Sequence, residues 1–140
     1  MIIISHRGNI RGPIPDKENR PSYTDCAIGN GYHVEIDVRS INGELWLGHD
    51  EPQYKTTAFF LNRTSLWCHA KNVEALHHML LEGIHCFWHE EDAYTVTSNG
   101  WIWAYPGQPG TKMAIAVMPE SDQDLSNYQG VCSDYPSRYQ

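Results

Sequence analysis

The feature that most constrains the fold is a succession of short strand-like segments with little room for helices between them. About eight segments have the apolar or alternating pattern of strands and are bounded by glycine, proline or polar clusters. They cover residues 2–5, 32–39, 65–70, 84–89, 93–97, 101–104, 113–117 and 131–133. Strands that alternate with helices along a chain favour a parallel sheet, so we expect an α/β protein.

Helical patterns are confined to three segments. Residues 72–82 give the clearest one, because apolar residues repeat at helical spacing, Asn72 can cap the start and Gly83 can end the helix. Residues 22–30 predict a second short helix, and residues 121–128 are a third candidate. Several connections between strands are too short for an ordinary crossover helix, so the outer layer of helices is expected to be incomplete.

A hairpin is predicted after the second strand. Asn42-Gly43 is a strong signal for a two-residue turn, and residues 44–48 return from it as a strand. His49 and Asp50 follow this return strand directly, so the hairpin fixes where these two polar side chains lie.

Length and charge exclude several classes of protein. The 140 residues predict one domain over residues 1–140, and 41% hydrophobic with 19% charged residues is a globular composition. The net charge of −7 disfavours nucleic-acid partners, since these require a basic surface. No run of about 18 apolar residues exists, so no membrane span is expected. The chain is also shorter than the ~250 residues of an ordinary (β/α)₈ barrel.

The expected location is the cytoplasm. The start, MIIISHRGN, lacks the basic region and the apolar length of a signal peptide. The cysteines lack metal-finger spacing, so we expect reduced, buried thiols rather than a zinc site. They are Cys26, Cys68, Cys86 and Cys132.

Two carboxylates share one face of the second strand. Glu35 and Asp37 are two residues apart, so their side chains project together. Neighbouring carboxylates repel each other unless a cation lies between them, and oxygen ligands suit Mg²⁺, Ca²⁺ or Mn²⁺. A solvated strand face, or pairing with Arg39 and Lys71, is the alternative.

Two histidines follow strands. His6 ends the first strand and His49 ends the hairpin return. Because histidine titrates near neutral pH, two of them can act as general base and general acid across one bond. Each histidine alone is more simply interpreted as an ordinary hydrogen-bonded residue. The order of the motifs along the chain, His-Arg-Gly, then Glu-x-Asp, then His-Asp, is what favours a catalytic role.

This ordered set resembles the glycerophosphodiester phosphodiesterase family, which belongs with the phosphatidylinositol phospholipase C-like barrels. The resemblance is dense over residues 6–50 and returns near the C-terminus. The matching segments are His6-Arg7-Gly8, Lys17-Glu18-Asn19-Arg20, Gly31-Tyr32-His33-Val34-Glu35-Ile36-Asp37-Val38, Asn42-Gly43, His49-Asp50 and Gly130-Val131-Cys132-Ser133-Asp134-Tyr135-Pro136.

The resemblance implies roles for these residues. His6 and His49 would be the catalytic acid–base pair, and Glu35 and Asp37 would bind a divalent cation, Mg²⁺ or Ca²⁺. Arg7 would neutralise charge on the phosphate, which its planar fork suits. In this family a neighbouring hydroxyl of the substrate attacks phosphorus, and water then opens the cyclic phosphate.

The third strand departs from the family pattern. The family has a metal-binding Glu two residues before a Lys, and here His69 precedes Lys71. Lys71 is expected to hold a phosphate oxygen. His69 as a ligand would shift the preference toward Mn²⁺ or Zn²⁺. Alternatively, His69 is only a hydrogen-bond partner of Glu35 or Asp37.

The resemblance therefore implies a compact, pruned TIM-like (β/α) barrel with several outer helices missing, sealed in part by a homodimer. Its expected function is metal-dependent hydrolysis of a small glycerophosphodiester, a reaction of lipid metabolism. The alternatives are a phosphodiesterase acting on a phospholipid or a nucleotide-type substrate, and a catalytically lapsed module that binds phosphate or sugar.

Two further features keep alternative interpretations. His89, in the charged run His89-Glu90-Glu91-Asp92, either lines the pocket or lies in a solvated loop. The aromatic segment from Trp101 to Gly107 either packs in the core through Trp103 and Tyr105, or forms an aromatic wall for the substrate alcohol, or is an exposed patch for a partner subunit.

Overall fold

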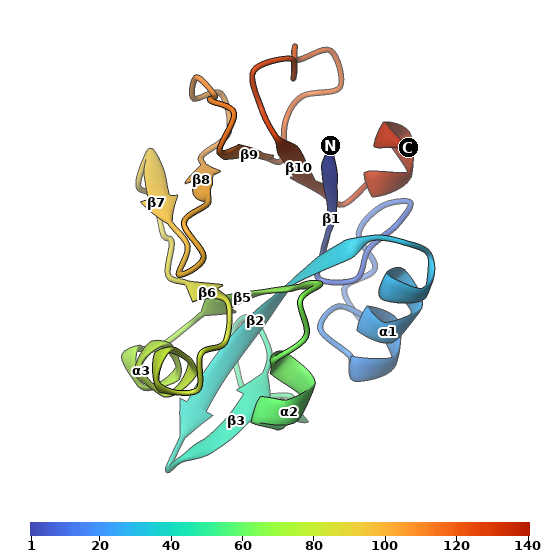
Figure 1. The fold of residues 1–140 in the computed structure, drawn as a ribbon. Coiled ribbons are helices and arrows are strands. Elements are labelled where there is room, and N and C mark those ends of the chain that lie inside the picture. Colours follow the sequence, from blue (N-terminus) through green and yellow to red (C-terminus); the bar gives the residue numbers. More distant parts are fainter.

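In the computed structural model, which describes residues 1–140, ten strands form one sheet that curls around a central axis (Figure 1). The strands are β1 (Ile2–His6), β2 (His33–Ile41), β3 (Glu44–Leu47), β4 (Tyr54–Lys55), β5 (Leu66–Ala70), β6 (Cys86–Phe87), β7 (Tyr94–Val96), β8 (Ile102–Ala104), β9 (Ala114–Val117) and β10 (Gly130–Ser133). The helices are α1 (Pro21–Gly29), α2 (Ala58–Leu61), α3 (Val73–Leu81) and the 3₁₀-helix η1 (Pro136–Tyr139).

The sheet is mixed. Parallel pairs join β6, β5, β2, β1, β10, β9 and β8 in that order, whereas β7 pairs antiparallel with β8. The antiparallel strands β3 and β4 extend the sheet beside the second half of β2. The first and last strands of the chain are therefore neighbours, and because these seven strands are parallel, their carboxyl ends lie at the same edge of the sheet.

The prediction of a TIM-like barrel is wrong. The molecule is a curled mixed sheet with three short α-helices that do not alternate with the strands. No strand ladder joins β6 to β7, and only isolated hydrogen bonds link the segments around them, such as that from Ser98 N to Cys86 O, 2.8 Å. We call this unpaired boundary the seam. Short, turn-rich connections between the later strands leave no length for covering helices.

The candidate helix at residues 121–128 is also wrong. This segment forms turns, in which the Asp124 carboxylate accepts a hydrogen bond from Ser126 N, 2.9 Å. Aspartate and serine side chains that bond to the local backbone compete with helix formation. Tyr128 at the end of the segment packs instead against the alanines of β8 and β9.

The helix α3 and the hairpin are confirmed. The Asn72 side chain accepts a hydrogen bond from Ala75 N, 2.9 Å, and Gly83 ends the helix with a φ of 70°. Asn42 and Gly43 have φ angles of 52° and 81°, which the predicted hairpin turn requires. Asn72 also donates to Ser40 O, 3.0 Å, so the helix cap fixes α3 against β2.

Apolar side chains pack on both faces of the sheet, but helices cover only the outer face. Helices α1, α2 and α3 lie outside β2 and β5 (Figure 1), over a core that includes Val34, Ile36 and Cys68. Inside the curl a second cluster contains Ile4, Trp67, Phe87, Trp103, Ile115 and Cys132. No helix of the molecule is long and apolar enough to cross a lipid bilayer.

The inner cluster positions the polar end of the curl. On five strands the residue two positions beyond a buried inner side chain is polar, and it lies at the carboxyl end of its strand. The pairs are Ile4 and His6, Trp67 and His69, Phe87 and His89, Trp103 and Tyr105, and Cys132 and Asp134. Because alternate residues share a face, these polar side chains lie above the apolar cluster.

Candidate functional site

Three potential metal ligands meet at the carboxyl end of the sheet. Glu35 and Asp37 on β2 and His69 on β5 each offer one ligand atom, and these atoms lie within 4.8 Å of one another. His69 Nδ1 is 3.2 Å from Glu35 Oε2 and 3.7 Å from Asp37 Oδ1. Strand pairing enforces this arrangement, because Asp37 and His69 are register partners.

Buried oxygen atoms in this group lack partners. Glu35 and Asp37 are almost fully buried, yet Glu35 Oε1 and Asp37 Oδ1 accept no hydrogen bond. A buried carboxylate oxygen without a partner is unfavourable. A divalent cation bound by both carboxylates would remove this cost, so the donor set fits a metal ion.

The second nitrogen of His69 supports the same interpretation. His69 Nε2 lies 2.8 Å from the carbonyl oxygen of His89, which can only accept a hydrogen bond. The His89 amide nitrogen is farther from the same atom, 3.3 Å, so we assign the N–H to Nε2. Without a metal ion, Nδ1 is within hydrogen-bond distance of Glu35 Oε2, 3.2 Å. With a metal ion bound, Nδ1 would lose its proton and offer its lone pair to the ion, as in metal sites where a backbone carbonyl fixes the imidazole.

Asp37 is held by the loop after β1. Its Oδ2 accepts a hydrogen bond from Asn19 Nδ2, 2.9 Å, and pairs with Arg7 Nε at 3.0 Å. Asn19 Oδ1 in turn accepts from Asp37 N, 2.9 Å. Arg7 and Asn19 have positive φ angles of 58° and 67°. Such backbone conformations are costly for residues other than glycine and concentrate at functional sites.

Electrostatics keeps Glu35 ionised. Burial alone would raise its pKa, but the hydrogen bond from His69 and the positive charges of His6, His69 and Arg7 lower the pKa to about 2. Arg7 also pairs with Glu18, 3.2 Å. The site therefore holds a negative carboxylate surrounded by cationic side chains.

His6 is held in one orientation. Its Nδ1 lies 2.7 Å from Asp134 Oδ1, and Asn9 Nδ2 donates to the same oxygen, 2.8 Å. The other ring nitrogen, Nε2, faces Glu35 Oε1 at 3.9 Å. Burial disfavours the charged ring, but the hydrogen bond to Asp134 and the charge of Glu35 raise the pKa of His6. This pairing resembles the base-and-orienter arrangement of general acid–base catalysis.

The two residues that we expect to bind phosphate, Arg7 and Lys71, differ in how closely carboxylates pair with them. Arg7 is engaged by Asp37 and Glu18, whereas Lys71 Nζ lies 4.0 Å from Asp37 Oδ1 and has no other ion-pair partner. Lys71 is thus the less neutralised cation beside the carboxylates.

His49 lies apart from the other predicted site residues. Its half-exposed side chain (40%) contacts the exposed Asp50, with 2.8 Å between Nδ1 and Oδ1. Together with Arg7, Glu18 and Asn19 it lines a polar hollow of about 190 Å³. Gly48 shapes this bend, because a Cβ there would lie 1.9 Å from Glu51 O. No hydrogen bond or ion pair joins His49 to His6, Glu35 or Asp37.

Several site residues were given no role from the sequence. Glu18, Asn19 and Asp134 stand within the quoted motifs, and their contacts with Arg7, Asp37 and His6 depend on distant pairing. The two-residue step from an inner apolar residue to a polar one is a signal that could have identified Asp134 and His89.

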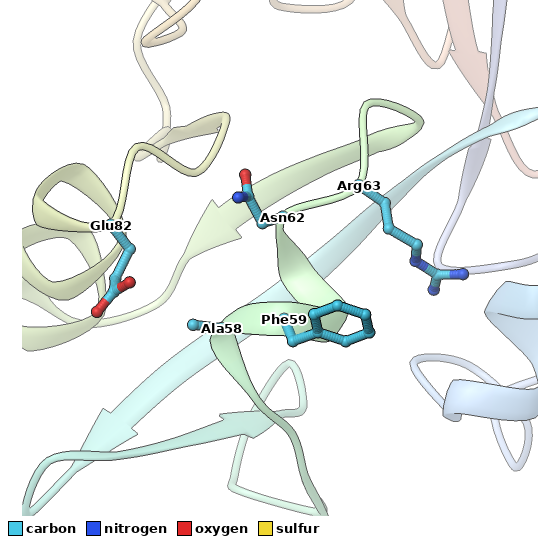
Figure 2. A pocket seen from close by; sticks show the side chains of 5 residues that line it. All are labelled: Ala58, Phe59, Asn62, Arg63 and Glu82. Atoms are coloured by element: carbon cyan, nitrogen blue, oxygen red, sulfur yellow. The ribbon is translucent and has the colours of Figure 1, made fainter.

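A separate hollow of about 390 Å³ lies between α2 and the end of α3 (Figure 2). Its lining includes Phe59, Arg63 and Glu82, whose side chains do not converge on a common point. Arg63 is paired with Asp25, 2.9 Å. This hollow shares no residue with the carboxyl-end site. No protein-family model, curated protein or solved structure matches the chain.

Proposed function

We propose that this protein hydrolyses a small phosphodiester of the glycerophosphodiester type, using a divalent cation held by Glu35, Asp37 and His69. The observation that carries the proposal is the pair of buried, partnerless oxygens, Glu35 Oε1 and Asp37 Oδ1, beside His69 Nδ1. The imidazole in the donor set favours Mn²⁺ or Zn²⁺ over Mg²⁺ or Ca²⁺.

A divalent cation held by Glu35, Asp37 and His69 would supply a Lewis acid for the phosphoryl oxygens. Around it, Lys71 binds a non-bridging phosphate oxygen, and Arg7 adds positive charge from the β1 side. His6 Nε2 accepts the proton of the attacking hydroxyl while Asp134 stabilises the imidazolium that forms.

The attacking group is the neighbouring hydroxyl of the substrate, as the resemblance implies. Its oxygen forms a bond to phosphorus, the bond to the leaving alcohol breaks, and His49 at the mouth gives that alcohol a proton. Water then opens the cyclic phosphate, and the two histidines exchange roles. The substrate spans the distance between His6 and His49.

The test is hydrolysis of glycerophosphocholine with Mg²⁺, Ca²⁺, Mn²⁺ or Zn²⁺ added. Bis(p-nitrophenyl) phosphate, which lacks a neighbouring hydroxyl, serves as the diester that should not be cleaved. We expect turnover with Mn²⁺ or Zn²⁺, and a loss of about 10²–10⁴-fold in His6→Ala. His77→Ala is the matched control, because His77 is exposed on α3. Absence of turnover with every metal, or full activity in His6→Ala, would contradict the proposal.

The substrate alternatives are compared in the same assay. A short-chain phospholipid and a cyclic nucleotide replace glycerophosphocholine, and the preferred substrate is the one with the highest kcat/KM. The net charge of −7 favours a small substrate over a polyanion.

A second candidate function is a lapsed module that binds phosphate or sugar. It is favoured by His49, whose side chain is 40% exposed, bonds to Asp50 and makes no hydrogen bond or ion pair with His6, Glu35 or Asp37. In that case glycerol 3-phosphate binds but no diester is cleaved.

We also propose a cytoplasmic location and a homodimer. All four cysteines are free thiols, which is typical of reducing compartments. Exposed apolar side chains at Phe59, Leu81 and Val96 support self-association. Cell fractionation and sedimentation velocity test these two points.

A further inference from the structure

His89 is a buried polar side chain without a partner. Its residue is 8% exposed, and neither Nδ1 nor Nε2 makes a hydrogen bond. Buried polar atoms are almost always hydrogen-bonded. A solvated loop, one of the two interpretations left open by the sequence, does not describe this residue. The partner must therefore come from outside the chain.

The backbone of His89 is anchored beside the proposed metal ligands, and its ring contacts Tyr105. Phe87, two residues earlier, stacks on the His69 ring at 4.9 Å between centroids. The His89 carbonyl oxygen accepts from His69 Nε2, so the backbone of His89 is anchored to the ligand set. Its ring packs against Tyr105, with 5.6 Å between centroids.

Tyr105 comes from the other side of the seam. It lies two residues beyond Trp103, whose ring packs against Phe87 inside the curl at 4.6 Å. The Tyr105 side chain is 40% exposed, so it presents part of its ring to solvent next to a buried imidazole. Aromatic faces of this kind pack well against the apolar face of a polyol.

The chemistry of an imidazole selects the ligand group. A neutral ring offers one N–H donor and one acceptor nitrogen, which matches a hydroxyl and not a phosphate, whose oxygens only accept. Lys71 and Arg7 already provide cationic donors for phosphate. His89 also lies outside the group of atoms that could share a metal ion.

We propose that His89 and Tyr105 form a subsite for the hydroxylated alcohol of the ligand, with the His89 ring hydrogen-bonded to a hydroxyl. The proposal rests on the proposed function, because the cation and Lys71 hold the phosphate of the same molecule. The substrate would then be a polyol phosphodiester, and His89 would determine the specificity for its alcohol.

The test compares binding of two probes by calorimetry at pH 7.5 with Mn²⁺ present. Glycerol 3-phosphate has both a phosphate and the hydroxyls of an alcohol, whereas inorganic phosphate has no alcohol part. We expect His89→Ala to weaken glycerol 3-phosphate binding about tenfold, the value of one lost hydrogen bond. Phosphate binding should change less than about twofold. His89→Gln, which keeps a donor and an acceptor, should restore part of the loss.

Controls separate the two proposals. Mn²⁺ affinity and the thermal midpoint should stay near the wild-type values in His89→Ala, and His77→Ala should bind both probes normally. Equal weakening of both probes, or of neither, overturns the subsite, and so does loss of Mn²⁺ affinity. Wild-type protein that binds neither probe overturns the proposed function and the subsite together. Equal affinity of the wild type for both probes overturns the subsite alone.

Discussion

The two ends of the curled sheet carry the same residue type in opposite environments. At the carboxyl end His6 contacts Asp134 and faces Glu35, and its pKa is raised. At the amino end His85 hydrogen-bonds to Thr97 Oγ1, 2.8 Å, and packs on Trp67 at 4.5 Å between centroids. Burial, with His33 nearby, lowers the pKa of His85 to about 4.

Burial lowers the pKa of both rings, and only His6 has carboxylate partners that outweigh it. Carboxylates stabilise the charged ring at the carboxyl end, whereas burial and the nearby His33 favour the neutral ring at the amino end. His33 follows the second pattern, since its Nδ1 accepts from Trp67 Nε1, 2.9 Å. A count of histidines therefore does not locate a functional site, but their partners do.

The largest expected effect concerns metal binding, which should stabilise only the carboxyl end. At a Mn²⁺ concentration about 100 times its Kd, the free energy of unfolding should rise by about 2.7 kcal/mol. Glu35→Gln should lose this gain, because one ligand charge is removed. Urea denaturation with and without Mn²⁺ measures both. His85→Gln is the matched control, and Mn²⁺ should stabilise it as much as the wild type. If Mn²⁺ stabilised Glu35→Gln as much as the wild type, the metal would not bind at the carboxyl end.

A second prediction concerns acid and the amino end. His85 has a pKa near 6.5 in the unfolded chain and about 4 in the folded one, so the unfolded state binds the proton first. The stabilising contribution is complete above about pH 6.5 and falls by about 2 kcal/mol as the pH drops to 4.5.

Denaturation of wild-type protein and His85→Gln at pH 7 and pH 4.5 checks this sign. The wild type should lose about 2 kcal/mol more than the variant over this interval. Equal losses would show that His85 is not kept neutral by the fold.

The smallest expected effect comes from Trp67→Phe. The variant loses the hydrogen bond to His33 and part of the indole volume, while Phe keeps the aromatic packing against Trp103. We expect a loss of about 1–2 kcal/mol, seen as a lower urea midpoint with an unchanged slope. A change below about 0.5 kcal/mol would mean that the Trp67–His33 contact is not stabilising.

Local signals predicted the parts of the molecule that depend on neighbouring residues. Asn72 and Gly83 delimit α3, and Asn42-Gly43 forms the hairpin, because caps and turns act over a few residues. Glu35 and Asp37 share a face because strand alternation is local. His69 joins them only through the pairing of β5 with β2, and the sequence left its role open for that reason.

Long-range packing explains what was missed. The resemblance implied a helical barrel, but the segment from Asp92 to Gln129 folds into short strands and turns without helices. The burial of His89 likewise depends on Tyr105 across the seam, a contact that no local pattern indicates.

The seam has a consequence for how ligands of different width are accommodated. Ladder hydrogen bonds fix the spacing of paired strands, but between β6 and β7 a few isolated bonds and side-chain contacts set the separation. His89 and Tyr105 stand on opposite sides of this boundary. The rim is therefore compliant at the point where the alcohol would bind, while the cation ligands on β2 and β5 are held in register. If the proposed function holds, strand ladders fix the part of the rim that would hold the phosphate, and no ladder fixes the part that would hold the alcohol.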